Sequence, residues 1–315
     1  MKILIIGLGS IGQRHALNLI KIGYKNLIFQ TPNKNKIQNK KLKKIKAYKK
    51  LNYALYEKPD LAFICTPTNS HTEIAIKLAK KKINFFMEKP VGNNENKIKK
   101  LIKLCKKNKI INMVGYMMRF HPAIIKLKSI INNSKKGDFF YFNSEWGEYL
   151  PEWNKYTKKN YKKNYAANKS MGGGVALTLS HDLDTARFLF GDVSGVSVKK
   201  NNFNPLKIQA ESIIDFNVNF KNNIYGNIHL DYLQKNKIRV WNLIGIKKRV
   251  TFDYYKKQLL IKKEKGKIFY NYKKFDRNKL FLNEIKYFLN CLKKNKKTNC
   301  DVDHSYKTLK QFKLL

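Results

Sequence analysis

Three glycines near the start of the chain constrain its fold more than any other feature of the sequence. They stand in the segment Gly7-Leu8-Gly9-Ser10-Ile11-Gly12, directly after the apolar run Lys2–Ile6. The first glycine permits a tight turn, the second lets the backbone approach a pyrophosphate, and the third lets a helix pack closely on a strand. A glycine-rich turn also occurs without a ligand, but the strand before it and the helix after it favour dinucleotide binding. We expect Ser10 and Ile11 to lie beside the phosphates, at the N-terminus of the helix.

Strand-like and helix-like segments alternate over the first 120 residues. The apolar runs of strand type are Lys2–Ile6, Leu27–Gln30, Asp60–Cys65, Ile83–Met87 and Ile110–Tyr116. Segments with helical spacing of apolar residues separate them, as at Thr72–Lys82 and Asn94–Lys107. The alternation predicts an α/β fold in which residues 1–120 form a Rossmann domain with a doubly wound parallel sheet.

The pattern changes after Arg119 toward strands that are joined by short turns. A glycine turn, Gly172-Gly173-Gly174, precedes a helix that ends near Phe190. The strand-like runs around it are Phe139–Glu145, Val193–Lys199, Ser212–Phe220, Ile224–Tyr232, Arg239–Ile244, Arg249–Phe252 and Gln258–Lys263. They predict an α+β domain over residues 121–315 with a large, open, mainly antiparallel sheet. The broad face of such a sheet needs covering, which favours an oligomer.

The net charge of +45 raises the question of nucleic-acid binding. Only six of the 66 basic residues are arginines, although proteins that read phosphates and base edges prefer the bidentate arginine fork. The lysines are spread along the whole chain, a pattern that is typical of solvated faces. We therefore expect no nucleic-acid partner, and a charge that steers anionic small molecules toward a cleft.

The cysteines and the apolar runs bear on location. The four cysteines are scattered and lack the paired spacing of a metal site or a disulfide framework. No uninterrupted apolar run approaches membrane-spanning length, and Met1-Lys2 leads directly into a strand. These features predict a reduced cytoplasmic protein with no structural metal and no membrane association.

The end of the second strand bears on the choice between NAD and NADP. An acidic residue at that place would hold the ribose hydroxyls of NAD, but the chain reads Gln30-Thr31-Pro32 instead. Without a carboxylate, nothing repels a 2′-phosphate, and Lys34 or Lys36 could pair with one. The alternative is that both lysines merely reflect a lysine-rich composition. The segment favours NADP over NAD, with Gln30 and Thr31 beside the adenosine ribose.

The triplet Glu88-Lys89-Pro90 ends the fourth strand-like run. In open α/β sheets, ligands bind beyond the carboxyl ends of the strands, so the triplet lies where a reactive end of a dinucleotide would lie. A lysine there can stabilise charge on a substrate oxygen and relay a proton. Taken alone, Lys89 would be one surface lysine among 60.

These landmarks, in this order and spacing, resemble the glucose–fructose oxidoreductase / inositol dehydrogenase (Gfo/Idh/MocA) family over almost the whole chain. The matching segments are Gly7–Gly12 with Arg14-His15, Cys65–His71, Glu88-Lys89-Pro90, Gly115-Tyr116, Arg119–Pro122, and Gly172–Gly174 followed by His181–Asp184. The stretch from Gly147 to Trp153, with Tyr161 and Tyr165, resembles a subgroup associated with surface-polysaccharide and nucleotide-sugar biosynthesis.

The resemblance implies roles for the matching residues. Thr66, Pro67, Asn69 and His71 would line the nicotinamide half of the cofactor, and Glu88 would contact its ribose. Lys89 would point at the reacting oxygen, while His181 would hydrogen-bond that oxygen or act as the general base. The resemblance also implies a homodimer or homotetramer built through the C-terminal sheet.

One departure from the family pattern concerns Thr178. Related sequences usually carry an aspartate one turn before the histidine, and a threonine cannot hold the negative charge that raises the pKa of a neighbouring imidazole or lysine. This substitution indicates an altered proton relay or an unusual substrate.

Further candidate substrate residues flank the glycine turn and follow the fifth strand. Amphipathic aromatic rings suit stacking on sugar faces, although they could equally fix a long loop on the sheet. Arg119 could grip a carboxylate or phosphate, with a structural ion pair as the alternative. The candidate substrate-binding residues are Tyr116, Arg119, Tyr149, Trp153, Tyr165, Thr178 and Asp184.

The sequence therefore predicts an NAD(P)-dependent dehydrogenase or reductase that acts on a sugar, sugar acid or nucleotide-sugar. Two alternatives stay open: a redox-neutral sugar enzyme that uses tightly bound NAD for elimination or epimerisation, and a non-catalytic dinucleotide-binding sensor or scaffold. The sequence names neither the substrate nor the reaction direction.

Overall fold

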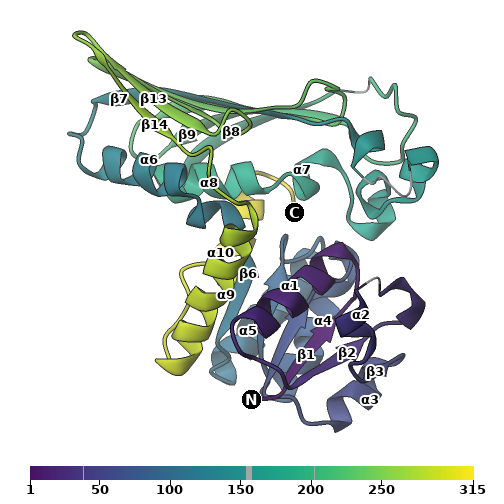
Figure 1. Cartoon of the computed structure of the whole chain (residues 1–315). Helices are drawn as coiled ribbons and strands as arrows, with labels where there is room; N and C mark the ends of the chain where they lie inside the picture. Colours follow the sequence, from purple (N-terminus) through teal and green to yellow (C-terminus); the bar gives the residue numbers. More distant parts are fainter. Residues whose placement is uncertain (38, 154–157, 202) are drawn as a thin grey trace. The chain divides into compact units, whose positions relative to one another are not determined.

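The computed structural model describes residues 1–37, 39–153, 158–201 and 203–315 (Figure 1). The chain forms two compact units: Met1–Tyr116 with Asn278–Tyr306, and Met117–Arg277 with Lys307–Leu315. The sequence-based boundary at residue 120 implies two continuous domains, whereas the segment Asn278–Tyr306 joins the first unit here. The division into functional domains at residue 120 stays a prediction.

The first unit contains a six-stranded parallel sheet in the order β3-β2-β1-β4-β5-β6. Its strands are β1 (Ile3–Ile6), β2 (Leu27–Gln30), β3 (Ala47–Tyr48), β4 (Leu61–Ile64), β5 (Asn84–Glu88) and β6 (Asn112–Gly115). β1 and β4 are buried along their whole length, because helices cover both faces of a doubly wound sheet. The predicted parallel sheet is confirmed. β3 escaped prediction because it is two residues long and follows a lysine-rich segment.

The helices of the first unit connect these strands. They are α1 (Ser10–Lys21), η1 (Lys34–Lys36), α2 (Lys40–Lys43), α3 (Leu51–Tyr56), α4 (Thr68–Lys80), α5 (Glu95–Lys107), α9 (Asn278–Lys293) and the first part of α10 (Val302–Gln311). The strand order reverses between β1 and β4, so right-handed crossovers place α1 and α4 on opposite faces. α1 contacts α9, and α4 contacts α5. The C-terminal ends of β1 and β4 thus form the switch point at which such folds bind ligands.

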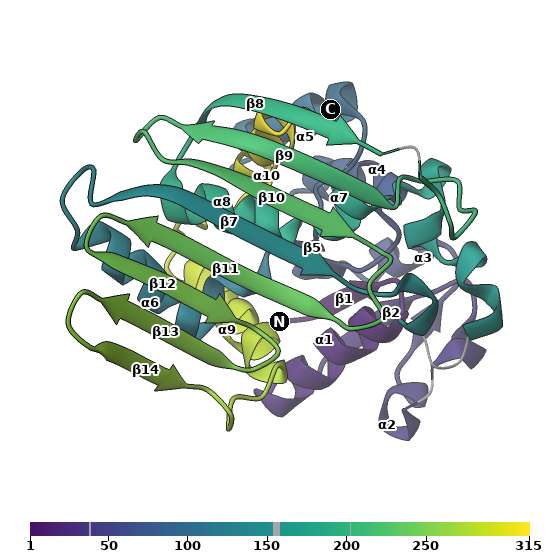
Figure 2. The same cartoon turned by 90° about the horizontal axis from the view of Figure 1, so that it is seen from above.

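The second unit contains an eight-stranded sheet in the order β14-β13-β12-β11-β7-β10-β9-β8 (Figure 2). Its strands are β7 (Phe139–Gly147), β8 (Val193–Lys200), β9 (Ile213–Phe220), β10 (Tyr225–Asp231), β11 (Ile238–Gly245), β12 (Lys248–Asp253), β13 (Gln258–Lys263) and β14 (Lys267–Asn271). The mainly antiparallel sheet is confirmed, with one difference. β7 pairs parallel with β10, because the helical segments after β7 let it lie between β10 and β11.

Helices cover one face of this sheet. α6 (Pro122–Asn132) and α8 (His181–Phe190) lie along it, and Phe190 packs on Phe142 with ring centroids 4.8 Å apart (Figure 1). The shorter helices are η2 (Met117–Phe120), η3 (Leu150–Glu152), η4 (Lys158–Lys163), η5 (Tyr165–Ala167), η6 (Lys169–Met171) and α7 (Val175–Thr178). No helix in the described ranges combines the length and apolar content that a membrane crossing requires.

The other face of the large sheet carries polar side chains. In β9, Ile214, Phe216 and Val218 are buried while the residues between them are more exposed, which is the alternation of a half-covered strand. His229 on β10 lies on the more exposed face between two carboxylates, 2.8 Å from Asp215 and 3.2 Å from Asp231. The hydrogen bond to Asp231, helped by Asp215, raises the pKa of His229 to about 9.

This arrangement predicts a pH-dependent stability. The raised pKa stabilises the protein fully below the ordinary value of 6.5, and the contribution is lost as the pH rises through about 9. The His229 side chain is 30% exposed, so after solvent screening we expect a loss of about 1–2 kcal/mol relative to His229→Gln. Urea unfolding of both proteins between pH 6.5 and 9.5 measures it. A difference that does not change with pH would contradict the charge on His229.

Candidate active site

The glycine turn lies between β1 and α1. A Cβ atom at Gly7 would lie 2.7 Å from the carbonyl oxygen of Cys65, and one at Gly12 would lie 1.9 Å from the carbonyl oxygen of Gly7. Gly7 also has a φ of +89°. Nothing lies within 4 Å of a Cβ at Gly9, which is the N-cap of α1 and provides no side-chain cap for the helix. The first turn of α1, with the N–H groups of Ser10 and Ile11, follows this open space, and binding of a pyrophosphate there stays a prediction.

The end of β2 presents amides and hydroxyls rather than a carboxylate. The side chain of Gln30 donates from Nε2 to the carbonyl oxygen of Lys49 at 2.8 Å. The backbone carbonyl of Gln30 accepts from the N–H of Gly7 at 2.9 Å. Thr31 is buried, and its Oγ1 donates to the carbonyl oxygen of Asn33 at 3.3 Å. The side chain of Lys36 lies outside the described part of the chain.

The loop after β4 is tied to the segment after β5 by His71. Its Nδ1 lies 2.8 Å from the carbonyl oxygen of Pro90, and its Nε2 lies 2.7 Å from the carbonyl oxygen of Thr66. Burial lowers the pKa of His71, whereas the two carbonyls and the charge of Glu88 act in the opposite direction. Thr66 is half-buried, and Pro67 and Asn69 are exposed at the start of α4. The buried ring of His71 therefore connects the predicted cofactor segment at Thr66 to the one at Pro90.

Glu88 ends β5, Lys89 follows it, and both are half-buried. Glu88 accepts a hydrogen bond from His15 of α1, with 2.7 Å between Oε1 and Nε2. The charges of Glu88 and Lys89 both act on the pKa of His71, so these groups lie near the Thr66 loop. The structure thus gathers the glycine turn, the Thr66–His71 loop and the Glu88-Lys89 pair at the C-terminal ends of three neighbouring strands.

In the second unit, two arginines fix α8. Arg119 donates from Nε and Nη2 to the two carboxylate oxygens of Asp184, both at 2.7 Å, and both side chains are buried. Arg239 of β11 binds Asp182, which also accepts a 2.8 Å hydrogen bond from Ser144. The geometry favours the structural ion pair for Arg119 and Asp184, because the guanidinium edge that would grip a substrate is engaged. Their predicted substrate contacts stay untested.

His181 begins α8 and is buried, with its ring 6.2 Å from that of Trp146. Thr178 ends α7 and is also buried, beside Tyr232. Burial raises the pKa of Tyr232 well above its usual range, and the neighbouring Thr178 hydroxyl opposes this effect. The structure places no acid at position 178, but Glu211 accepts a hydrogen bond from the N–H of Ala176 at 3.3 Å. Sequence reasoning missed Glu211 because it lies 33 residues after Thr178.

The aromatic candidates have mixed surroundings. Tyr116 is fully buried, with its hydroxyl 3.2 Å from Ser305 in the first unit. Trp153 meets Tyr232 edge-on at 5.3 Å, and Lys235 lies over the ring of Tyr149 at 5.5 Å. Tyr149, Trp153 and Tyr165 are half-buried. Residues 154–157 of the predicted aromatic loop lie outside the described ranges.

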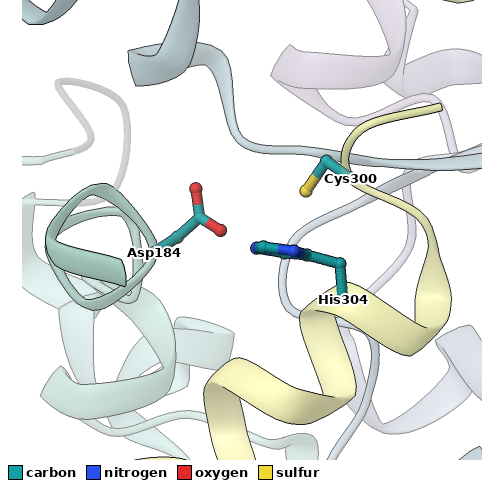
Figure 3. Close-up of side chains that lie close together, drawn as sticks. All are labelled: Asp184, Cys300 and His304. Atoms are coloured by element: carbon teal, nitrogen blue, oxygen red, sulfur yellow. The ribbon is translucent and has the colours of Figure 1, made fainter. Parts of the chain in front are cut away.

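Cysteine and histidine residues also occur near the C-terminus. Cys300 precedes α10 and His304 lies in its first turn, both in the first unit, whereas Asp184 lies on α8 in the second (Figure 3). Sequence reasoning also missed Glu284, a buried acid on α9. The signal in the sequence that could have indicated Glu284 is the helical spacing of apolar residues in α9, in which this acid takes an apolar position.

Comparison with known proteins identifies relatives for both halves of the chain. Residues 1–116 match the model of an oxidoreductase family with an NAD-binding Rossmann fold, and residues 124–250 match that family's GFO/IDH/MocA C-terminal domain. Myo-inositol 2-dehydrogenase of Thermotoga maritima is 31% identical over 198 residues, 61% of this chain and 55% of that protein. The alignment therefore spans about half the length of that relative.

Two further comparisons concern different reactions. The 2,7-anhydro-N-acetylneuraminate hydratase of Mediterraneibacter gnavus is 28% identical over 144 residues, 44% of this chain and 35% of that protein. The crystal structure of UDP-N-acetylglucosamine 3-dehydrogenase from Acidithiobacillus ferrooxidans has a TM-score of 0.80 at 19% identity, and the match covers 98% of this chain and 94% of that one. At this identity the structural match shows the fold alone.

The buried pair of Arg119 and Asp184 can be tested by a double-mutant cycle. Arg119→Met leaves the Asp184 carboxylate buried without its guanidinium, which should cost about 3–5 kcal/mol of unfolding free energy. Combining it with Asp184→Leu should restore most of that loss, because two apolar groups replace two charges. Urea unfolding measures each variant.

The matched control for this cycle is Lys97→Met, which breaks an exposed pair with Glu73 and should cost less than about 1 kcal/mol. If Arg119→Met costs no more than this control, the pair is not structural.

Proposed function

The chain belongs to the Gfo/Idh/MocA family of oxidoreductases, and on this premise we propose that it is an NAD(P)-dependent dehydrogenase or reductase of sugar-type substrates. The observation that carries the proposal is the position of Lys89. It directly follows β5, next to Pro90, whose carbonyl oxygen lies 2.8 Å from the buried His71, and it belongs to an NAD-binding Rossmann fold. When bound, the cofactor would supply or accept the hydride that a carbinol or carbonyl carbon exchanges.

The residues around the switch point would hold that cofactor. Backbone N–H groups at the start of α1 would bind its phosphates, and Gly9 leaves the space they need. Thr66, Pro67, Asn69 and His71 would border the nicotinamide, and Glu88 would accept from a ribose hydroxyl. The missing carboxylate at Gln30 and Thr31 supports NADP over NAD, which competition between NADH and NADPH can decide.

Two residues would manage the proton. The ammonium of Lys89 would stabilise negative charge on the reacting oxygen, and the imidazole of His181 would hydrogen-bond it or take its proton. Glu211, which lies between β8 and β9, provides a carboxyl group beside the first turn of α7, where it accepts from the N–H of Ala176. The chemistry of the two side chains and the family support this assignment.

The substrate and assembly are also proposals. The inositol dehydrogenase relative and the UDP-N-acetylglucosamine dehydrogenase fold support a sugar or nucleotide-sugar substrate. The net charge of +45 would attract the anionic members of that class. The more exposed face of the eight-stranded sheet supports a homodimer or homotetramer. The location that we propose is the cytoplasm.

A redox-neutral reaction is the second candidate, and the resemblance to a hydratase favours it. Here tightly bound NAD would take a hydride from the sugar and later return it, while the same residues would move the proton. Between the two transfers, water or a neighbouring group could leave or add. Cofactor that co-purifies, together with turnover in the absence of added NAD(P), would distinguish this reaction from a simple dehydrogenase.

Replacing Lys89 tests the proposed role directly. We expect purified protein to oxidise NADH or NADPH with at least one member of a panel of keto-sugars and nucleotide-sugars. Lys89→Met should lower kcat about 100-fold or more, because a proton carrier is removed. The matched control is Lys107→Met on the exposed face of α5, which should retain activity. Full activity of Lys89→Met would contradict the role, and a bound cofactor without any turnover would contradict the function.

Enlarging Gly9 tests the phosphate site separately. Gly9→Ala adds a Cβ that has no atom of the described residues within 4 Å, so the fold should be kept and the melting temperature should fall only slightly, through the weaker N-cap of α1. We expect the Kd for NADH, measured by fluorescence, to rise about tenfold or more because the pyrophosphate can no longer approach. Unchanged affinity would place the phosphates elsewhere.

A further inference from the structure

Glu284 is an acid in the middle of an apolar helix face. On α9, its buried neighbours along the same face include Leu280, Phe281, Ile285 and Phe288. Glu284 itself is 1% exposed, and neither of its carboxylate oxygens has a hydrogen-bond partner among the described residues. An unpaired buried carboxylate is costly, so a group in this position requires a physical explanation.

Two other titratable groups lie next to it within the first unit. One ring nitrogen of His15, one oxygen of Glu88 and one oxygen of Glu284 all lie within 4.8 Å of one another. His15 is 0% and Glu88 12% exposed at the side chain, and the two are joined by the 2.7 Å hydrogen bond. A Cβ at Gly115, the register partner of Glu88, would lie 3.6 Å from Oε2 of Glu284. The three groups therefore form one cluster at the ends of β5 and β6.

Aromatic rings surround this cluster. The ring of His15 lies 5.1 Å from that of Phe86, 5.6 Å from Phe63 and 5.9 Å from Phe281. Phe288 packs on Phe86 at 5.8 Å. Such surroundings exclude water and strengthen the repulsion between two carboxylates, so the cluster favours a single negative charge.

Burial, followed by the charge of Glu88, raises the pKa of Glu284 well above its ordinary value. The charged or titratable groups that face it from neighbouring elements are His15 on α1, Cys65 after β4 and Glu88 on β5. Arg14 of α1 lies against Phe281 at 4.6 Å and adds a positive charge nearby. Burial also raises the pKa of Cys65, with Glu88 and Glu284 acting in the same direction, so the thiol adds no charge.

The donor set suits a shared proton better than a metal ion. A divalent cation would need both carboxylates ionised and a fourth ligand, whereas the cluster supplies three groups inside an aromatic shell. A neutral acid needs no such compensation. It can also donate a hydrogen bond, which a carboxylate cannot do.

We propose that Glu284 is a positioning residue for the dinucleotide: it stays a neutral acid, offers a hydrogen-bond donor to the His15–Glu88 pair, and keeps Glu88 as the single carboxylate beside the nicotinamide ribose. The proposal rests on the proposed function for the ribose contact. His15 holds one oxygen of Glu88, so the other is left for the ribose. A second negative charge at position 284 would push Glu88 away from that position.

The first experiment tests the proton without cofactor. The full chain and Glu284→Gln are unfolded with urea between pH 5 and 9. An acid with a raised pKa stabilises the folded state fully below its unfolded pKa, and this contribution falls as the pH rises toward its folded pKa. We expect the unfolding constant of the wild type, relative to that of Glu284→Gln, to rise with pH by up to about tenfold per pH unit, and to level off once the pH passes the folded pKa of Glu284.

The matched control is Glu73→Gln, an exposed acid whose pKa is lowered by the hydrogen bond with Lys97. The unfolding constant of the wild type relative to that of Glu73→Gln should not change from pH 5 to 9, because Glu73 is ionised in both the folded and the unfolded state. A flat ratio for Glu284→Gln as well would overturn the neutral acid.

The second experiment measures the Kd for NADH by fluorescence at pH 7. Glu284→Leu should raise the Kd about tenfold, because the hydrogen-bond donor beside the His15–Glu88 pair is lost. The same variant should be at least as stable as the wild type, since an apolar group replaces a buried acid. Glu284→Gln, which can still donate through its amide, should recover most of the affinity.

The outcomes separate this inference from the proposed function. If the wild type does not bind NADH or NADPH at all, the proposed function fails, while the urea experiment still decides the charge on Glu284. If the wild type binds but Glu284→Leu has an unchanged Kd, Glu284 is only structural and the proposal fails. Stoichiometric zinc or magnesium in the wild type, lost in Glu284→Leu, would overturn the shared proton in favour of a metal.

Discussion

The first unit depends on one close approach, between Gly12 at the start of α1 and the carbonyl oxygen of Gly7 after β1. No side chain fits there, because even a Cβ would lie 1.9 Å from that oxygen. The contact sets α1 directly over β1 and β4, and so brings His15 to Glu88 at the end of β5. α9 then packs on α1 and brings Glu284 to the same cluster. The cluster of His15, Glu88 and Glu284 next to Lys89 thus depends on the absence of a side chain at Gly12.

The second unit is stabilised by two buried ion pairs that use the scarce arginines and acidic residues of the chain. The chain has 21 acidic residues against 66 basic ones, yet two of its few acids are buried on α8. Each takes an arginine, from η2 and from β11, so a helix that carries His181 is fixed by bidentate and short-range ion pairs rather than by lysines. The abundant lysines lie mostly at exposed positions, which agrees with their interpretation as solvated faces.

Much of the fold was predictable because its signals are local. The apolar runs of β1, β4 and β5, the glycine turn and the alternation of β9 each lie within a few residues. The parallel pairing of β7 with β10 was not predictable, since it joins strands about 85 residues apart and no turn specifies it. The return of α9 to the first unit is equally nonlocal, as its pattern indicates only an amphipathic helix.

The sequence by itself determined the family, the dinucleotide turn and the Glu88-Lys89 pair, because backbone conformation and strand ends leave marks on neighbouring residues. The tertiary structure alone decided how polar groups are paired. It bound Arg119 to Asp184, joined Glu211 to the N–H of Ala176 in the helix that ends at Thr178, and buried Glu284 against His15 and Glu88. These contacts join residues 35 to 269 positions apart. Whether a side chain is charged, buried or available to a ligand depends on such neighbours, and a linear pattern does not contain them.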